Sequence, residues 1–184
     1  MLTNRPSSMF FWPTPERPVA ERGEGMYIWD KSGKRFIDAC SGPQTTSLGH
    51  GNPRVIAAMA EQGQKLAYAF RSHFLNEPAE MLAHEVADLC PPGLDMCFFN
   101  SGGSEAVEAC LKLARLYALA RGEAARYKVI SRVPSYHGTT LGALSVTGDP
   151  AGFAQFAPMM VNHPKIPAPF CRYRRAGQSE DEAA

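Results

Sequence analysis

The chain has 184 residues, a formal net charge of +1, 45% hydrophobic residues and 20% charged residues. These proportions are ordinary for a globular protein and argue against a disordered or fibrous one. The small net charge gives no electrostatic basis for binding nucleic acid, because the basic residues are dispersed except at residues 172–175. No apolar run approaches the ~20 residues of a membrane-spanning helix, and residues 1–5 lack the apolar core of a signal peptide. We therefore expect a cytoplasmic protein that has neither a nucleic acid nor a membrane as its partner.

The five cysteines carry no metal-binding pattern. They form no C-x-x-C pair and lie mostly among apolar neighbours, which predicts buried free thiols and no metal site. They are Cys40, Cys90, Cys97, Cys110 and Cys171.

The first predicted element is a β-hairpin over residues 26–39. Its turn is expected at residues 31–34, where Ser and Gly lie between two lysines. A helix over residues 54–69 should follow, because Asn-Pro at 52–53 is typical of a helix start.

A second helix is predicted over residues 77–89, and the Pro-Pro-Gly at 91–93 ends it. A strand, a long helix and another strand then follow, over the residues up to 133. Helices that alternate with strands indicate an α/β fold with a parallel sheet. The proline-rich run 164–169 lacks a regular P-x-x-P array, so we interpret it as a connector.

A small-residue turn separates the apolar Phe98-Phe99 from the long helix. The free N–H groups of the helix start, the glycines and the Ser104 hydroxyl would converge on one point, which predicts an anion site that fits a phosphate. The alternative is that Ser104 is an ordinary helix cap. The apolar positions of the helix have amphipathic spacing and are Val107, Leu111, Ala114 and Ala118.

A second polar turn, residues 134–140, follows the predicted strand 127–133. Ligands of open α/β sheets bind beyond the carboxyl ends of the strands, so Tyr136 and His137 should face the anion site. The Tyr136 ring could stack on a flat heterocycle, and the His137 imidazole could form a hydrogen bond or relay a proton. The alternative is that Tyr136 is a packed loop aromatic.

Other phosphate-site or nucleophile motifs are absent from the sequence. The turn is not G-x-G-x-x-G, and no G-x-x-x-x-G-K-[ST] is present, which argues against Rossmann and P-loop nucleotide binding. No serine stands in a G-x-S-x-G context, so Ser104 is not predicted to be a hydrolase nucleophile.

Taken together, four segments resemble the class III aminotransferases, which are pyridoxal-phosphate enzymes of fold type I. The segments are residues 100–108, 135–145, 24–39 and 47–53. The resemblance implies a partial fold of this type, with an N-terminal hairpin and helix segment followed by the first part of the large parallel-sheet domain. Residues 1–75 would belong to the small domain, and residues 76–184 would form an incomplete large cofactor-binding domain.

The resemblance also implies roles for individual residues. Gly103 and Ser104 would hold the phosphate of pyridoxal 5′-phosphate, Tyr136 would stack on its pyridine ring, and His137 would lie beside that ring. Residues 101–102 would shape the loop.

The resemblance implies further parts of the substrate site near the N-terminus. Phe11 or Trp12 and the Pro43-Gln44 turn would line the substrate entrance. An exposed aromatic residue could instead pack against a partner surface.

Transamination needs a lysine that forms a Schiff base with the cofactor and a carboxylate on its pyridine nitrogen. In the family both lie beyond the matched segments, so we predict that this chain supplies no catalytic lysine and is the N-terminal part of an enzyme. The polar segment 174–184 is consistent with a chain cut within a loop. The lysines of the whole chain are predicted to be solvated surface charges. They are Lys31, Lys34, Lys65, Lys112, Lys128 and Lys165.

Three hypotheses for function remain open. The first is an aminotransferase that moves an amino group between an amine or amino acid and a 2-oxo acid. The second is a related aminomutase, racemase or decarboxylase on the same scaffold. The third is a truncated binding fragment without catalytic activity. The family implies a homodimer for the complete enzyme.

Overall fold

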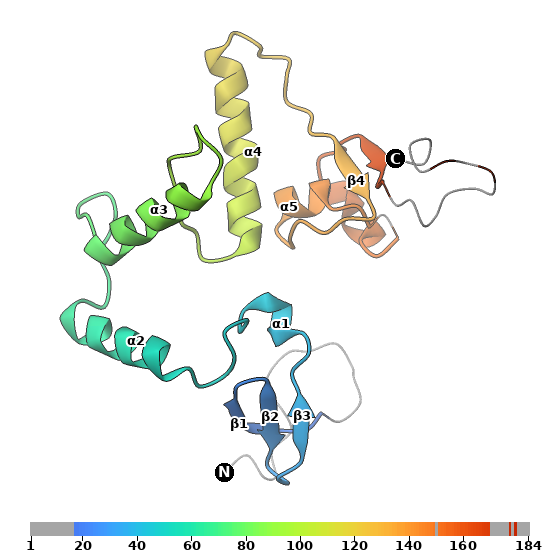
Figure 1. The fold of residues 1–184 in the computed structure, drawn as a ribbon. Coiled ribbons are helices and arrows are strands. Elements are labelled where there is room, and N and C mark those ends of the chain that lie inside the picture. The colour runs from blue at the N-terminus through green and yellow to red at the C-terminus, as the bar shows by residue number, and fades with distance from the viewer. Residues whose placement is uncertain (1–16, 150, 170–176, 178, 180–184) are drawn as a thin grey trace. The chain divides into compact units, whose positions relative to one another are not determined.

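The computed structural model describes residues 17–149, 151–169, 177 and 179 (Figure 1). The chain divides into two compact units, Met1–Met81 and Leu82–Ala184. The assignment of residues 1–75 and 76–184 to a small and a large domain stays a prediction. The substrate-entrance aromatics Phe11 and Trp12, the basic run 172–175 and all but two residues of the polar segment 174–184 lie outside the described residues.

The first unit contains the predicted hairpin as part of a three-stranded antiparallel sheet. Strands β1 (Ala20–Glu24), β2 (Tyr27–Asp30) and β3 (Arg35–Ile37) lie in the order β1-β2-β3. The turn forms where the sequence predicts it because Asp30 Oδ1 accepts hydrogen bonds from Ser32 N at 2.9 Å and from Lys34 N at 3.0 Å. The bond from the Ser32 hydroxyl is the largest of several that lower the pKa of Asp30.

Three helical segments follow the sheet: α1 (Ser41–Gln44), α2 (Pro53–Lys65) and α3 (Glu77–Leu89). The bounds of α3 are those predicted. Helix α2 begins as expected, since Asn52 Oδ1 accepts from Arg54 N at 3.1 Å, but it ends at Lys65 rather than at residue 69. The reason is that the backbone becomes extended at Leu66, with φ −160° and ψ 113°.

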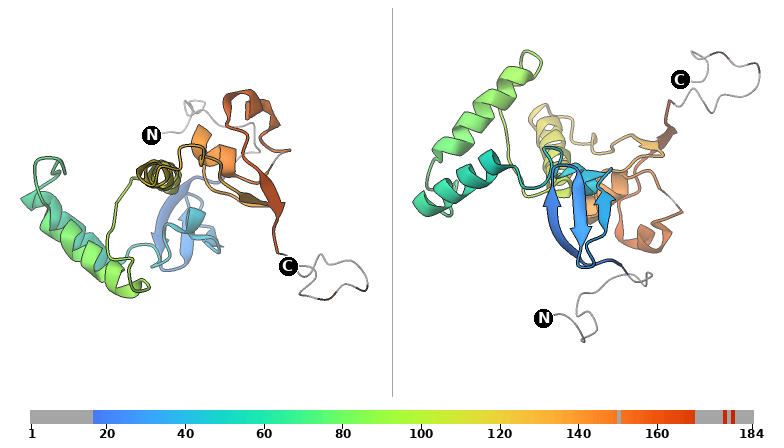
Figure 2. Two further views of the ribbon diagram at one scale, coloured as in Figure 1. Left: turned by 90° about the horizontal axis from the view of Figure 1, so that it is seen from above. Right: turned by 60° about the horizontal axis from the view of Figure 1, so that its bottom comes forward.

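The second unit contains α4 (Gly103–Ala120), β4 (Ser131–Val133), α5 (Leu141–Val146), the 3₁₀-helix η1 (Ala154–Met159) and β5 (Lys165–Pro167). Helix α4 packs against α5, and β4 pairs with β5 in parallel (Figures 1 and 2). The long helix is therefore confirmed, and it begins at Gly103.

Both predicted strands of this unit differ from expectation. Only Ser131–Val133 of the predicted strand 127–133 is paired, because β5, its partner strand in the described part of the chain, is three residues long. The run 94–100 before α4 contains no strand among the described residues, since no neighbouring strand pairs with it. The proline-rich run predicted as a connector supplies β5 instead.

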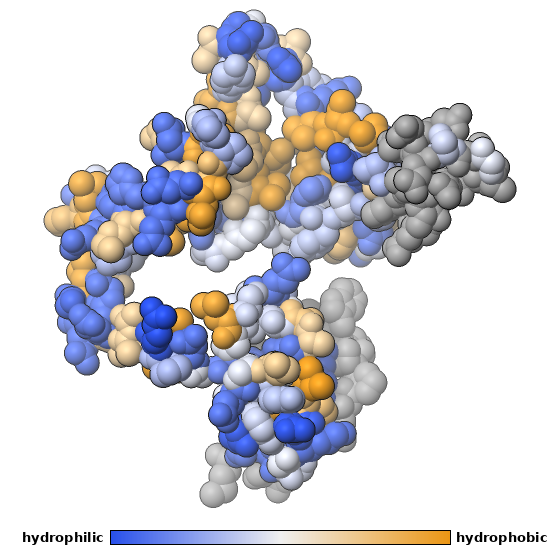
Figure 3. Space-filling view, in the orientation of Figure 1, coloured by the Kyte–Doolittle hydropathy of each residue, from blue (hydrophilic) through white to orange (hydrophobic). Residues whose placement is uncertain are grey.

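The small apolar core of the second unit lies at α5. Among the described residues, the buried apolar side chains are Ala118, Ala143, Leu144 and Val146, whereas many large apolar side chains elsewhere are exposed, as the hydrophobic surface in Figure 3 illustrates. The prediction of buried cysteines is wrong for Cys40, Cys90 and Cys110, which are exposed because few side chains cover them. In the part of the chain that the structure describes, no helix is long and apolar enough to cross a membrane.

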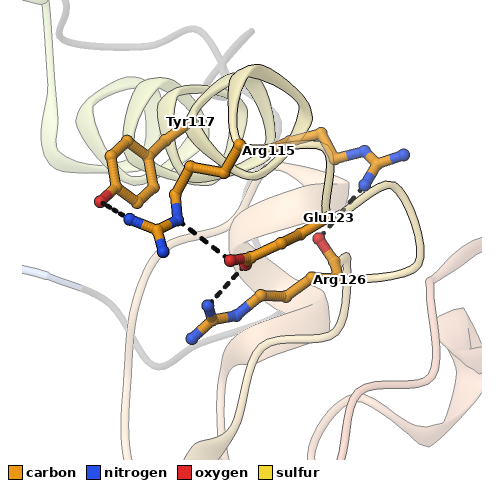
Figure 4. A network of polar contacts seen from close by, with 5 residues as sticks. Arg115, Tyr117, Glu123 and Arg126 are labelled. Carbon is orange, nitrogen blue, oxygen red and sulfur yellow. Dashed lines mark hydrogen bonds and ion pairs between the residues drawn. The ribbon is translucent and has the colours of Figure 1, made fainter.

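A polar network holds the end of α4 (Figure 4). Glu123 accepts hydrogen bonds from Arg121 Nε at 3.0 Å and from Arg126 Nη1 at 2.7 Å. Arg115 Nη1 donates to the carbonyl oxygen of Ala124 at 2.7 Å. Both arginine partners of Glu123 are solvent-exposed, so each ion pair contributes little to the free energy of unfolding.

Candidate functional site

The start of α4 is open to solvent and has no side-chain cap. The N-cap residue is Gly102, which has no side chain that could cap the helix start. A Cβ placed on Gly103 would meet no atom within 4 Å. Gly102 and Gly103 are exposed, and the positive end of the helix dipole favours an anion at this point. The chain's own Glu105 is near, because its Oε2 would lie 2.9 Å from a Cβ on Gly102.

The Ser104 hydroxyl is fixed in a way that suits phosphate binding. Its oxygen accepts a hydrogen bond from the Thr139 backbone N–H at 3.0 Å, while the hydroxyl proton remains available as a donor. Thr139 belongs to the second predicted turn, so this bond brings the two predicted turns together. The cap alternative is not what forms, because the Ser104 side chain bonds to this turn and the cap position is Gly102.

Gly138 allows the two turns to approach this closely. Its φ of +135° is unfavourable for residues with a side chain, and a Cβ there would lie 2.6 Å from Ser104 Oγ and 2.9 Å from the Ala143 Cβ. A residue larger than glycine would therefore push the turn away from the start of α4.

Tyr136 and His137 lie just before this contact and differ in burial. The Tyr136 side chain is 68% exposed, which argues against the packed-aromatic alternative and leaves the ring free to stack on a ligand. His137 is half-buried, and its backbone N–H donates to Thr147 Oγ1 at 3.0 Å. It borders a hollow of ≈ 700 Å³, together with apolar residues of α4 that include Val107 and Leu111.

Glu108 is a site residue that the sequence reasoning missed. Its Oε1 accepts hydrogen bonds from the backbone N–H groups of Gly142 at 2.9 Å and Ala143 at 3.2 Å. The nearby Thr140 hydroxyl, followed by these N–H groups, lowers the pKa of Glu108 against the opposing effect of desolvation. The sequence feature that could have identified Glu108 is its position one helical turn after Ser104.

The prediction that Lys165 is a solvated surface charge is wrong. Its Nζ donates to Ser131 Oγ at 2.8 Å and to the Ser145 carbonyl oxygen at 2.7 Å. The side chain is half-buried because β5 lies beside β4 and the end of α5, and this burial lowers its pKa. Lys65 is exposed as predicted and pairs with Glu61.

The Pro43-Gln44 turn lies within α1 of the first unit. Ser41 and Gln44 have positive φ values of 52° and 63°, so this segment is a strained turn rather than a regular helix. Asp38 supports it by accepting from Ser41 N at 2.9 Å, and its other oxygen lies 2.8 Å from His50 Nε2. The hydrogen bond from His50 is the main cause that lowers the pKa of Asp38.

The sequence as a whole decides which family this is. The model of the family described as Aminotransferase class-III matches residues 13–184. The chain belongs to the class III aminotransferases. This aminotransferase chain is 36% identical over 165 residues to the uncharacterized aminotransferase YodT of Bacillus subtilis, a match that covers 90% of this chain and 37% of that protein. It is 41% identical over 141 residues to an acetylornithine aminotransferase of Clostridium acetobutylicum, covering 76% of this chain and 35% of that protein.

Solved structures agree with the family assignment. The omega transaminase of Pseudomonas jessenii in complex with PMP matches with a TM-score of 0.87 and 31% identity, covering 95% of this chain and 41% of that one. The class III chain therefore has part of the α/β fold of fold type I, as predicted. It spans 37%, 35% and 41% of the lengths of these three proteins.

Class III aminotransferases use pyridoxal 5′-phosphate, and the residues described here fit such a cofactor. The open space above Gly103, the uncapped N–H groups and the free donor of Ser104 suit a phosphate. The exposed ring of Tyr136 suits a flat heterocycle.

Proposed function

We propose that this chain is the N-terminal part of an aminotransferase that moves an amino group between an amine or amino acid and a 2-oxo acid. The observation that carries the proposal is the hydrogen bond from Thr139 N to Ser104 Oγ. It joins the helix start that we propose to bind the phosphate to the turn that bears Tyr136 and His137, in a chain of the class III family.

Each site residue has a distinct task in this proposal. The Gly103 N–H and the Ser104 hydroxyl donate hydrogen bonds to the cofactor phosphate. Tyr136 stacks on the pyridine ring and fixes its plane, while His137 bounds one side of the ring. The bound cofactor supplies the electron sink and carries the amino group. The protein residues named here bind and orient it.

The catalytic lysine and the carboxylate for the pyridine nitrogen are proposed to lie outside this chain. Of its lysines, Lys165 is held by Ser131 and Ser145, and Lys65 is paired with Glu61. Because the catalytic lysine and the carboxylate are proposed to lie outside it, we expect the chain alone to bind cofactor without transferring amino groups. For the complete enzyme we propose a homodimer in the cytoplasm, as the family resemblance and the sequence imply.

The test is binding of pyridoxamine 5′-phosphate, which has no aldehyde to react with surface lysines. The purified chain should bind it, and Ser104→Ala should weaken binding about fivefold to tenfold because one hydrogen bond to the phosphate is lost. The control is Ser72→Ala, since Ser72 is an exposed serine of the first unit. Equal affinities of the Ser104 variant and the unaltered chain would contradict the proposed phosphate site.

A second assay tests the missing lysine. The chain is incubated with an amine donor, pyruvate and pyridoxal 5′-phosphate, and alanine is measured. The amount of alanine formed should not exceed the amount formed by the cofactor in solution without the protein. Clear turnover above that background would overturn the proposal that this chain has no catalytic lysine.

A further inference from the structure

We propose that Glu108 is a positioning residue that holds the turn bearing Tyr136 and His137 against the start of α4. This inference rests on the proposed function, because the ring that Tyr136 and His137 would contact belongs to the proposed cofactor. Glu108 itself acts through the backbone of Gly142 and Ala143, which it binds directly.

The geometry of α4 places two anchors on one face. Ser104 and Glu108 are four residues apart, so their side chains leave the same side of the helix one turn apart. Ser104 Oγ accepts from Thr139 N at 3.0 Å, and Glu108 Oε1 accepts from Gly142 N at 2.9 Å. One helix face therefore fixes two successive points of the segment that follows His137.

The Glu108 carboxylate supplies the hydrogen-bond acceptor that the start of α5 lacks in its own cap residue. Thr140 is the N-cap residue of α5 and makes no side-chain cap bond, so the N–H groups of Gly142 and Ala143 depend on Glu108. A Cβ on Gly142 would collide with both oxygens of Glu108, which means that glycine at this position lets the carboxylate approach. A carboxylate is a strong acceptor for backbone N–H groups, and here it serves two of them.

A third contact holds the other side of the turn. His137 N donates to Thr147 Oγ1 at 3.0 Å, and that oxygen is itself within 3.0 Å of the Ala143 carbonyl oxygen, to which it donates. Residues 143–148 are all buried. The turn with Tyr136 and His137 is thus tied to a buried helix whose first N–H groups are bound by Glu108.

This arrangement separates the ring site from the phosphate site. Gly103 and Ser104 belong to α4 and should keep their places when Glu108 is shortened, whereas the 136–143 segment would lose two hydrogen bonds. Loss of Glu108 should consequently weaken binding of a ring-bearing ligand much more than binding of inorganic phosphate. A residue that merely stabilised the fold would weaken both to the same degree.

The experiment compares the full 184-residue chain with Glu108→Ala, Glu108→Gln and Glu123→Gln. Glu123 is the matched control, because it is a glutamate just beyond the other end of α4 that also accepts two hydrogen bonds. Calorimetry measures binding of pyridoxamine 5′-phosphate and of inorganic phosphate. Hydrogen exchange of residues 136–147 is followed in the absence of ligand.

We expect Glu108→Ala to weaken the binding of pyridoxamine 5′-phosphate about tenfold and to change the affinity for inorganic phosphate less than about twofold. It should also speed hydrogen exchange of the backbone N–H groups of Gly142 and Ala143. Glu108→Gln keeps an acceptor oxygen and should restore most of the affinity, which also keeps the test valid if the alanine variant does not fold. Glu123→Gln should match the unaltered chain in both measurements.

Four results would count against these ideas in different ways. If Glu108→Ala weakens the binding of both ligands equally, or leaves the binding of both unchanged, the positioning role is overturned while the proposed function stands. No binding of pyridoxamine 5′-phosphate by the unaltered chain would overturn the proposed function together with the ring-positioning role. In that case, unchanged exchange in Glu108→Ala would also overturn the structural tie between α4 and this segment.

Discussion

The Lys165 ammonium lies 2.7 Å from the Ser145 carbonyl oxygen. Ser145 is in the last turn of α5, where the negative end of the helix dipole favours a cation. The same ammonium donates to Ser131 Oγ at 2.8 Å, so one side chain of β5 joins β4 to the end of α5. The small core of the second unit is thereby closed by a polar contact as well as by apolar packing.

Removal of this ammonium should destabilise the second unit. We expect Lys165→Met to lower the free energy of unfolding by about 1–3 kcal/mol, because the Ser131 hydroxyl and the Ser145 carbonyl of two buried residues lose this hydrogen-bond donor. Urea denaturation monitored by circular dichroism measures the change. Lys128→Met is the control, since Lys128 is exposed. Equal loss in both variants would contradict a specific role for Lys165.

Gly138→Ala should disturb the site through backbone strain and collision. The φ of +135° and the short approach to Ser104 leave no room for a methyl group, so we expect a loss of about 1–3 kcal/mol in stability. Gly103→Ala is the comparison, because a Cβ there meets nothing within 4 Å, and its stability should not fall. The same denaturation assay distinguishes the two. Full stability of Gly138→Ala would mean that the turn can move away from α4 at no cost.

The parts that could be predicted from the sequence are those governed by neighbouring residues. The hairpin turn follows from Asp30, Ser32 and Gly33, and α3 ends before two prolines, so both signals lie within a few positions. The meeting of the two turns was also predicted, from the rule that strand ends share one edge of a sheet. That prediction succeeded even though the strand expected before α4 is absent from the described residues.

The parts that could not be predicted depend on partners far away in sequence. Lys165 is bound by Ser131, 34 positions earlier, and Glu108 binds Gly142, 34 positions later. Hydropathy and spacing assign Lys165 to the solvent and single out no contact for Glu108, because neither pattern contains the distant partner. The prediction of a strand at Phe98-Phe99 is wrong for the same reason, since pairing requires a neighbouring strand that the sequence pattern does not identify.

Acid should weaken the contact between Glu108 and the turn. The pKa of Glu108 in the folded chain lies below its ordinary 4.5, mainly because the Thr140 hydroxyl and the N–H groups of Ala143 and Gly142 favour the charged form. The stabilisation is therefore complete above pH 4.5 and is lost as the pH falls through the lower, folded-state pKa. The nearby positive charge of Lys112 acts in the same direction.

Denaturation of the unaltered chain and of Glu108→Gln between pH 3 and pH 7 measures this effect (about the range in which carboxylates titrate). The difference in unfolding free energy between the two should shrink as the pH falls below 4.5, because the variant has no carboxylate to protonate. Asp38, whose pKa is also lowered, titrates in both proteins and cancels in the difference. A difference that stays constant with pH would contradict a lowered pKa at Glu108.

The exposed apolar residues of α4 should make the chain self-associate. Leu113 and Leu116 are 67% and 63% exposed, and they lie three positions apart, so they form neighbouring parts of one helix face. Exposed apolar area of this kind favours contact between molecules.

We expect the apparent mass in sedimentation experiments to rise with concentration, and Leu116→Glu to reduce that rise without lowering the free energy of unfolding. Leu144→Glu is the contrasting variant, because Leu144 is buried and its replacement should unfold the second unit. A chain that stays monomeric at every concentration would show that this helix face does not drive association.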